Sequence, residues 1–295
     1  MILTTSDKLR NRPYCYEDES FEGYLCRVAE VNYISRNMLI NEYGINDLLK
    51  RSGNDINLVM KFINEKNNHD YTNNSFKFIS ENGLYLSCFW RQKYTKYCPL
   101  CIAEKPYHHI QWMVAPIIVC PKHCVELHNN CKNCYNNVTY IDVIKDSCSN
   151  CSCKLSSLYT FSAKDKQNLM LMFDKVTQQG VIWNGMNVLE YYIFVKRISW
   201  FINYHISSKE DQIYTDIDKA KNRTSWYVVN LWNLNKLMSK VYEVTNDWPY
   251  SFFQYYTSIP RGLKNKINYL RGYVIAKTKV DQTFEDFFMR YISIK

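Results

Sequence analysis

The chain has 295 residues, 46% of them hydrophobic and 22% charged, and a formal net charge of +9. This length is enough for about two domains, and the balance of residue types excludes global disorder. The longest apolar run is far shorter than the roughly 20 residues of a membrane span, and the N-terminus lacks the apolar stretch of a secretory leader. We therefore expect a cytoplasmic protein rather than a membrane or secreted one.

The first predicted elements are two short helices. Apolar residues recur at helical spacing after a capping Asp or Ser, which predicts a helix over about 20–31. A turn and a second helix over about 36–43 follow, so this part is compatible with a helix-turn-helix. The acidic residues 17–19 are interpreted as a complement to the helix dipole. Further along, residues 52–75 look like loops around one short helix, and we expect a strand or two within 76–90 and a strand over 112–119.

Nine of the twelve cysteines fall between Cys98 and Cys153, most of them in pairs. The first set is a Cys-x-x-Cys segment and, after a gap of 18 residues, a Cys-x-x-His segment; the second has two Cys-x-x-Cys segments separated by 13 residues. Each such segment can place two ligands on one metal ion, and four soft ligands in a tetrahedron suit structural zinc. We predict two structural Zn²⁺ ions, held by Cys98, Cys101, Cys120 and His123 and by Cys131, Cys134, Cys148 and Cys151.

Two alternatives concern these ligands. A disulfide framework is disfavoured, because the expected compartment is reducing. Within the zinc sets, Cys124 can replace His123, and Cys153 can replace Cys151.

The predicted zinc sites offer four protein ligands each, whereas a catalytic zinc keeps one position open. The deaminase and H-E-x-x-H metalloprotease motifs are absent from the sequence, as are the phosphate-binding glycine loops. We therefore expect no enzymatic activity.

The last part of the chain is predicted to be helical and basic. Residues 161–295 carry 19 basic and 12 acidic side chains, so they hold +7 of the net charge. Within 248–280 there are six basic residues and no acidic one, a composition that attracts nucleic acid. The candidate phosphate contacts are Arg261, Lys264, Lys266 and Arg271. Helices are expected at about 163–179, 187–206, 225–245, 249–257 and 281–292.

The expected fold is therefore mainly α with small zinc-ribbon β elements. We divide the chain into an N-terminal helix-turn-helix-like domain over 1–97, a tandem zinc-ribbon region over 98–160 and a basic helical domain over 161–295.

Three groups of residues together point to one family. In the N-terminal group, an acidic pair precedes a helix that ends in an Arg-hydrophobic-Ala-x-x-Asn stretch. In the predicted zinc region, the ligands have a particular spacing, a proline follows the first cysteine of each pair in the first set, and a tryptophan lies between these pairs. A Trp-Pro-x-x-Phe element lies near the C-terminus. The residues are Arg12-Pro13-Tyr14, Asp18-Glu19-Ser20-Phe21, Arg27-Val28-Ala29, Asn32, Tyr97-Cys98-Pro99-Leu100-Cys101, Trp112, Cys120-Pro121-Lys122-His123, Leu127, Cys131, Cys134 and Trp248-Pro249 with Phe252. With these residues the chain resembles the TniQ/TnsD family of bacterial transposon target-selection proteins.

The resemblance implies a non-enzymatic protein that marks a transposition target, either by binding DNA or by docking on a guide-RNA-directed complex, and then recruits an AAA+ ATPase regulator. It also implies helix-turn-helix elements around zinc ribbons and a homodimer as a further partner. The family usually has glycine after the histidine ligand, where this chain has Cys124. The alternative hypothesis is a zinc-stabilised DNA- or RNA-binding transcription regulator with no role in transposition.

Overall fold

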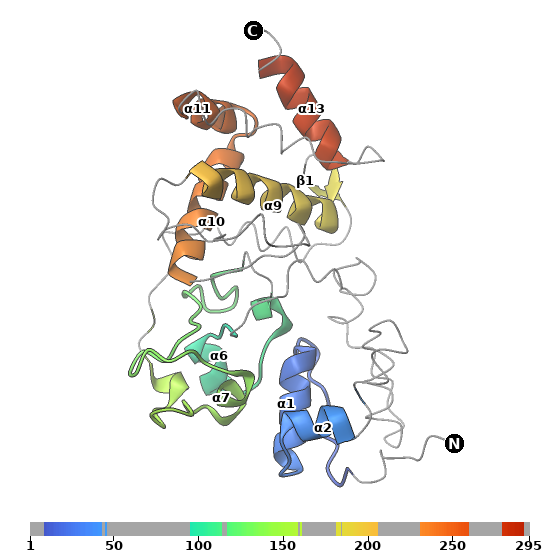
Figure 1. Cartoon of the computed structure of the whole chain (residues 1–295), viewed down its shortest axis with the longest axis vertical. Coiled ribbons are helices and arrows are strands. Elements are labelled where there is room, and N and C mark those ends of the chain that lie inside the picture. The colour runs from blue at the N-terminus through green and yellow to red at the C-terminus, as the bar shows by residue number, and fades with distance from the viewer. Residues whose placement is uncertain are drawn as a thin grey trace, which may run out of the picture. The chain divides into compact units, whose positions relative to one another are not determined.

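The computed structural model describes residues 9–42, 45, 95–113, 117–158, 160, 181–183, 185–205, 231–259 and 279–291. These residues form helices, with two short strands and a few isolated β-bridges. The chain divides into two compact units, each described below by itself. Figure 1 shows the helices of the first unit in blue to green and those of the second in yellow to red. The prediction of a mainly helical fold is confirmed for the described residues.

Six short elements are found in the described part of the first unit. They are the helices α1 (Phe21–Val31), α2 (Arg36–Glu42), α6 (Pro99–Glu104) and α7 (Tyr140–Lys145) and the 3-10 helices η2 (Ile110–Met113) and η3 (Leu155–Ser157). The helix α1 begins where the Ser20 side chain accepts a hydrogen bond from the Gly23 N–H. Its apolar face is completely buried, with Tyr24, Leu25 and Val28 at 0% exposure. The two helices expected near 20–31 and 36–43 are thus present.

A loop from the zinc-ligand region anchors the start of α1. The Ser20 N–H donates to the His108 carbonyl over 2.7 Å, and the His108 Nδ1 lies 2.7 Å from the Ser20 hydroxyl. A Cβ on Gly23 would lie 2.7 Å from the His108 Cβ, which explains why glycine occupies this position. The N-terminal segment and the loop around His108 therefore fold together.

The acidic residues before α1 have specific partners. Glu19 is completely buried and pairs with Arg27, whose guanidinium nitrogens lie 2.8 and 2.6 Å from the carboxylate. Asp18 accepts hydrogen bonds from the His109 ring and the Tyr107 hydroxyl, both over 2.6 Å. Burial acts to raise the pKa of Asp18, but these hydrogen bonds outweigh it and lower the pKa. The sequence pattern did not predict these partners.

The helix α7 has a complete cap at each end. At its start the Thr139 hydroxyl and the Asp142 carboxylate form a capping box, and at its end Asp146 adopts a left-handed backbone with φ 49°. Both α1 and α2 pack together, and α7 packs against α1, so these helices share one core.

In the residues that the structure describes, the second unit has one hairpin and four helices. The strands β1 (Val181–Trp183) and β2 (Met186–Asn187) are antiparallel, and β2 runs directly into α9 (Val188–His205). The helices α10 (Leu231–Asn246), α11 (Tyr250–Ser258) and α13 (Lys279–Tyr291) follow. Figure 1 shows α9 lying across α10, and these two helices pack against each other. This agrees with the helices expected at 187–206, 225–245, 249–257 and 281–292.

Aromatic side chains hold the second unit together. Phe194 of α9 stacks on Phe284 of α13 with ring centroids 5.2 Å apart, and Trp248 packs edge-on against both rings. Phe252 and Phe287 complete this cluster, and both are buried. Large rings buried in this way contribute most of the apolar area of a small core. The Trp-Pro-x-x-Phe element thus supplies two core rings, with Pro249 as the residue before α11.

Other expectations differ from the structure or lie outside it. The strand expected over 112–119 is wrong for the part of this range that the structure describes, because Trp112 and Met113 lie in η2 and Val119 forms only an isolated bridge, with Glu126. The hairpin at 181–187 was not predicted. The expected helix over 163–179, the strands within 76–90 and the loops of 52–75 lie outside the described residues. The three-domain division stays a prediction.

Among the helices that the structure describes, none has the length and apolar character needed to cross a bilayer.

The buried ion pair of Glu19 and Arg27 gives a first testable prediction. Replacing Arg27 with methionine keeps much of its volume but leaves the Glu19 carboxylate buried without its cation. We expect the free energy of unfolding to fall by about 3 kcal/mol, the usual cost of breaking a buried pair on one side. Urea unfolding followed by circular dichroism measures this. The control is Lys145→Met, which breaks the exposed pair with Glu30 and should cost less than about 1 kcal/mol. Equal losses in the two variants would contradict the prediction.

Candidate metal centres

The structure brings the eight predicted ligand residues together in two groups. In each group the four candidate ligand atoms lie within 4.8 Å of one another, and three side chains of the first group and two of the second are buried. The first group is Cys98, Cys101, Cys120 and His123, and the second is Cys131, Cys134, Cys148 and Cys151. Such sets can hold a metal ion. That these residues bind one stays a prediction.

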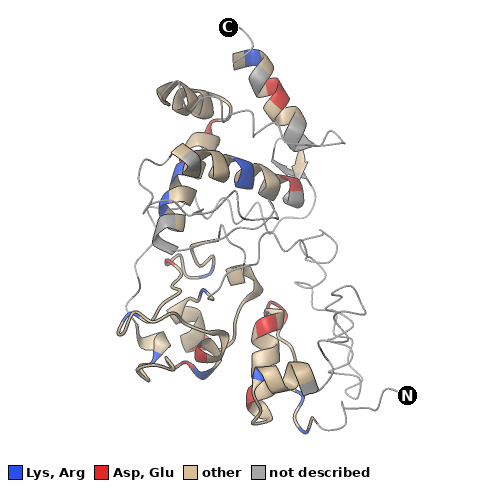
Figure 2. Ribbon diagram, viewed as in Figure 1, with Lys and Arg blue, Asp and Glu red and all other residues tan. Residues whose placement is uncertain are grey.

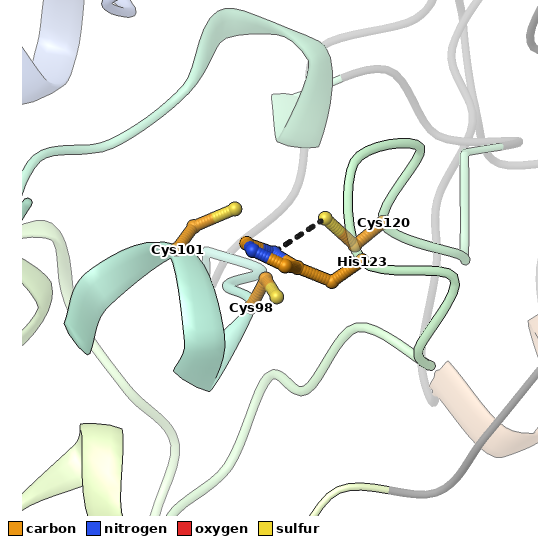
Figure 3. Close-up of side chains that lie close together, drawn as sticks. All are labelled: Cys98, Cys101, Cys120 and His123. Carbon is orange, nitrogen blue, oxygen red and sulfur yellow. Dashed lines mark hydrogen bonds between the residues drawn. The ribbon is translucent and has the colours of Figure 1, made fainter. Parts of the chain in front are cut away.

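Helix α6 positions half of the first group. Cys98 precedes the helix, Pro99 takes its first position, and Cys101 follows one turn later. Cys120 and His123 come from a turn, where the Cys120 Sγ lies 3.7 Å from the His123 Nδ1. Figure 3 shows the four side chains converging from these two segments.

Three of the four ligand segments share one backbone turn. In each of them the residue after the second ligand donates its N–H to the carbonyl of the first ligand, over 2.8 to 2.9 Å. The N–H of the first ligand donates to the carbonyl of the residue five positions later, again over 2.8 to 2.9 Å. This repeated turn places the two ligand side chains of each segment on one side of the backbone. The turns start at Cys120, Cys131 and Cys148.

The residue after each of these turns has a left-handed backbone. The φ angles are 53° at Cys124, 60° at Tyr135 and 57° at Ser152. This conformation favours glycine. At Cys124 the chain therefore has a cysteine in a backbone conformation that glycine adopts more readily. Cys124 is therefore part of the turn, and it does not belong to the group of four residues whose ligand atoms lie close together around His123.

In the second group, short sulfur–sulfur distances join the two segments. The Sγ atoms of Cys134 and Cys148 are 3.6 Å apart, as are those of Cys131 and Cys151. Cys153 supplies a fifth thiol, 3.4 Å from the Cys131 Sγ. Cys151 belongs to the group in which all four sulfurs are close, and Cys153 does not.

Burial and hydrogen bonding act differently on these thiols. Hydrogen bonds from the Asn133 side chain and the Cys153 backbone lower the pKa of Cys151 to about 6. Burial raises the pKa of Cys131 and of Cys148 to about 11. A bound cation would favour the thiolate of every ligand and so offset this cost.

The nearby histidines have other roles. His108 contacts Ser20 and the Thr95 hydroxyl, and His109 pairs with Asp18, so neither joins a metal group. His128 lies 5.8 Å from the Tyr97 ring and is buried. Outside the groups, Cys26 is buried, and burial raises its pKa to about 12. Cys15 is only half-buried.

The predicted phosphate contacts Arg261, Lys264, Lys266 and Arg271 lie outside the described residues. On the described helices, Lys and Arg are interspersed with Asp and Glu (Figure 2).

Comparison with protein families matches residues 11–127 to the TniQ family model. The residues that resemble TniQ make up less than half of the chain. The match confirms the family resemblance expected from the sequence. The TniQ match covers α1, its anchoring loop and the whole first metal group, and it ends before Cys131. No curated protein matches the chain. A TniQ domain supports a general role in target selection associated with transposition.

From the two groups of candidate ligands we predict how many metal ions the purified protein and its variants hold. Cys98→Ser and Cys131→Ser should each lower the bound metal by one ion per chain, because three ligands hold a structural ion far less tightly than four. Metal analysis of the purified protein measures this. Cys15→Ser is the control and should leave the content unchanged.

The same measurement separates the two candidate ligands of the second group. Cys151→Ser should weaken metal binding, and Cys153→Ser should not, because only Cys151 lies in the close group. The reverse result would make Cys153 the ligand.

Proposed function

We propose that this chain selects the target site for a transposon. It binds target DNA, or docks on a DNA-targeting complex that is guided by RNA, and then recruits an AAA+ transposition regulator. The observation that carries the proposal is the TniQ match over residues 11–127, which includes a full set of candidate metal ligands. A homodimer is part of the same proposal.

Both metal groups are proposed to hold Zn²⁺ in a structural role. Thiolate sulfur and imidazole nitrogen are the ligands that zinc prefers, and four protein ligands complete a tetrahedron. Such a set has no open position for a water or substrate, so it supports a protein without enzymatic activity. The residues that would hold the ions are the four of each group, and zinc would supply folding free energy to segments that have few apolar residues.

The proposed contact with DNA lies in the basic segment of the C-terminal part. Arg261, Lys264, Lys266 and Arg271 would neutralise phosphates, which positions a protein on DNA without reading sequence. Sequence choice would then come from other residues or from a partner complex.

The first experiment measures binding to random double-stranded DNA over a series of salt concentrations. Replacing the four basic residues with glutamine should weaken binding to all sequences alike. It should also reduce the slope of log K against log salt by about 3.6, since each phosphate contact contributes about 0.9. The matched control removes four positive charges elsewhere, by glutamine at Lys105, Lys132, Lys145 and Lys154. Unchanged affinity in the first variant would reject this DNA-contact assignment.

The second experiment tests recruitment. An AAA+ transposition regulator is mixed with the zinc-loaded protein, and their complex is sought by size-exclusion chromatography with and without DNA and ATP. Complex formation supports target selection. DNA binding without any complex would favour the alternative, a zinc-stabilised transcription regulator.

A further inference from the structure

The second metal group lies beyond the TniQ match, yet it belongs to the same compact unit as α1. The matched residues end at 127, and the second group starts at Cys131. Between its two segments the chain forms α7, and α7 packs against α1. The helix α7 therefore connects the second metal group, to which it is joined along the chain, with α1, against which it packs.

The Asp142 carboxylate connects α7 to the second group. It is 1% exposed, and three hydrogen-bond donors surround it. Its Oδ2 accepts from the Thr139 N–H and hydroxyl, both over 2.8 Å, and its Oδ1 accepts from the Ser149 N–H over 2.9 Å. Ser149 lies inside the segment between Cys148 and Cys151. One buried carboxylate thus holds the cap of α7 and the ligand-bearing turn at the same time.

The backbone adds to this connection. The Ser147 N–H donates to the Asp142 carbonyl over 3.0 Å, directly before the first ligand of the turn. Hydrogen bonds to Asp142 therefore fix the turn to α7 on both sides of Cys148, at Ser147 and at Ser149. Neither contact requires a bound ion, but both set the direction from which Cys148 and Cys151 approach it.

Side chains of α7 are connected to both ends of α1, indirectly at its start and directly near its end. Near the start of α1, the Tyr140 ring packs on His108 with centroids 4.6 Å apart, and His108 in turn contacts the capping residue Ser20. Near its end, the Lys145 ammonium lies 3.1 Å from the Glu30 carboxylate. That ion pair is exposed and worth little. The packing of α7 and the contact through His108 carry the connection.

We propose that Asp142 is a positioning residue of the second metal site, and that α7 links occupancy of that site to the stability of α1. A metal ion fixes the turn from Cys148, the turn holds Asp142, and Asp142 holds the cap of α7 against α1. Because such coupling is reciprocal, a folded α1 and α7 also strengthen metal binding at the second group. The inference rests on the proposed metal sites, and it does not depend on DNA or on the ATPase.

The test is amide hydrogen exchange by mass spectrometry on the full zinc-loaded chain, in a graded series of chelator concentrations. Peptides over 120–125 and 148–153 report loss of the first and second ion, and peptides over 21–31 report α1. In the unmodified protein, protection of α1 should fall at the same chelator concentration as that of 148–153. Loss of α1 protection only with 120–125, or no change in α1 when 148–153 opens, would overturn the coupling.

The variant Asp142→Asn tests the positioning residue. An amide retains one acceptor and turns its NH₂ toward a donor, so either the cap or the ligand turn loses its hydrogen bond. The second site should then lose its ion at a free metal concentration about 10- to 100-fold higher, the usual effect of removing an outer partner of a metal ligand. The first site should keep its affinity. Equal weakening at both sites would show general destabilisation and reject the positioning role.

Asp247→Asn is the matched control, since it removes the same charge from an exposed position in the second unit. It should shift neither midpoint. If Asp142→Asn stays unprotected even at saturating zinc, the chelator series on the unmodified protein still decides the coupling. A protein that keeps this coupling but binds neither DNA nor the ATPase would reject the proposed function alone.

Discussion

The convergence of four cysteine thiols from two separate turns is the constraint on which much of the first unit depends. Apart from α1, its described helices have three to seven residues, which is too short to be stable in isolation. Each of these helices buries only one or two aliphatic or aromatic side chains, such as Trp112 in η2 and Leu155 in η3. What orders them is the backbone geometry of the ligand turns, together with buried polar contacts such as those of Asp142 and Glu19. A metal ion would tie these local structures into one body.

The sequence predicted best those features that are local in the chain. The ligand spacing is local, and so is the apolar periodicity of α1, α9 and α10, and all were expected at nearly their observed positions. The hairpin at 181–187 was missed although Asn184-Gly185 is a typical two-residue turn, and Gly185 has φ 77°. The strand expected over 112–119 was wrong because an apolar run fits a strand and a buried 3-10 turn equally well.

Contacts between distant residues could not be predicted in this way. The partners of Ser20 and Asp18 lie about 90 residues further on, and nothing in the local pattern of either residue indicates His108 or His109. The acidic residues 17–19 were interpreted as a complement to the helix dipole, which requires no partner residue. That interpretation gave no reason to expect the contacts of Asp18 and Glu19. The same holds for Asp142, which looks in sequence like an ordinary capping residue and turns out to bind the ligand turn as well. Long-range polar contacts of buried residues are set by the fold as a whole.

The left-handed residues that follow the ligand turns have a consequence for how such a chain can vary. At Cys124, Tyr135 and Ser152 the backbone is left-handed, a conformation that most side chains disfavour. The side chains of these residues belong to neither ligand group. Tyr135 is 75% exposed, so its side chain can be exchanged at little cost in packing. Substitutions at these three positions would therefore change the stability of a turn while leaving its sulfur and nitrogen donors in place. They offer a graded adjustment of how readily each turn opens, independent of the metal chemistry itself.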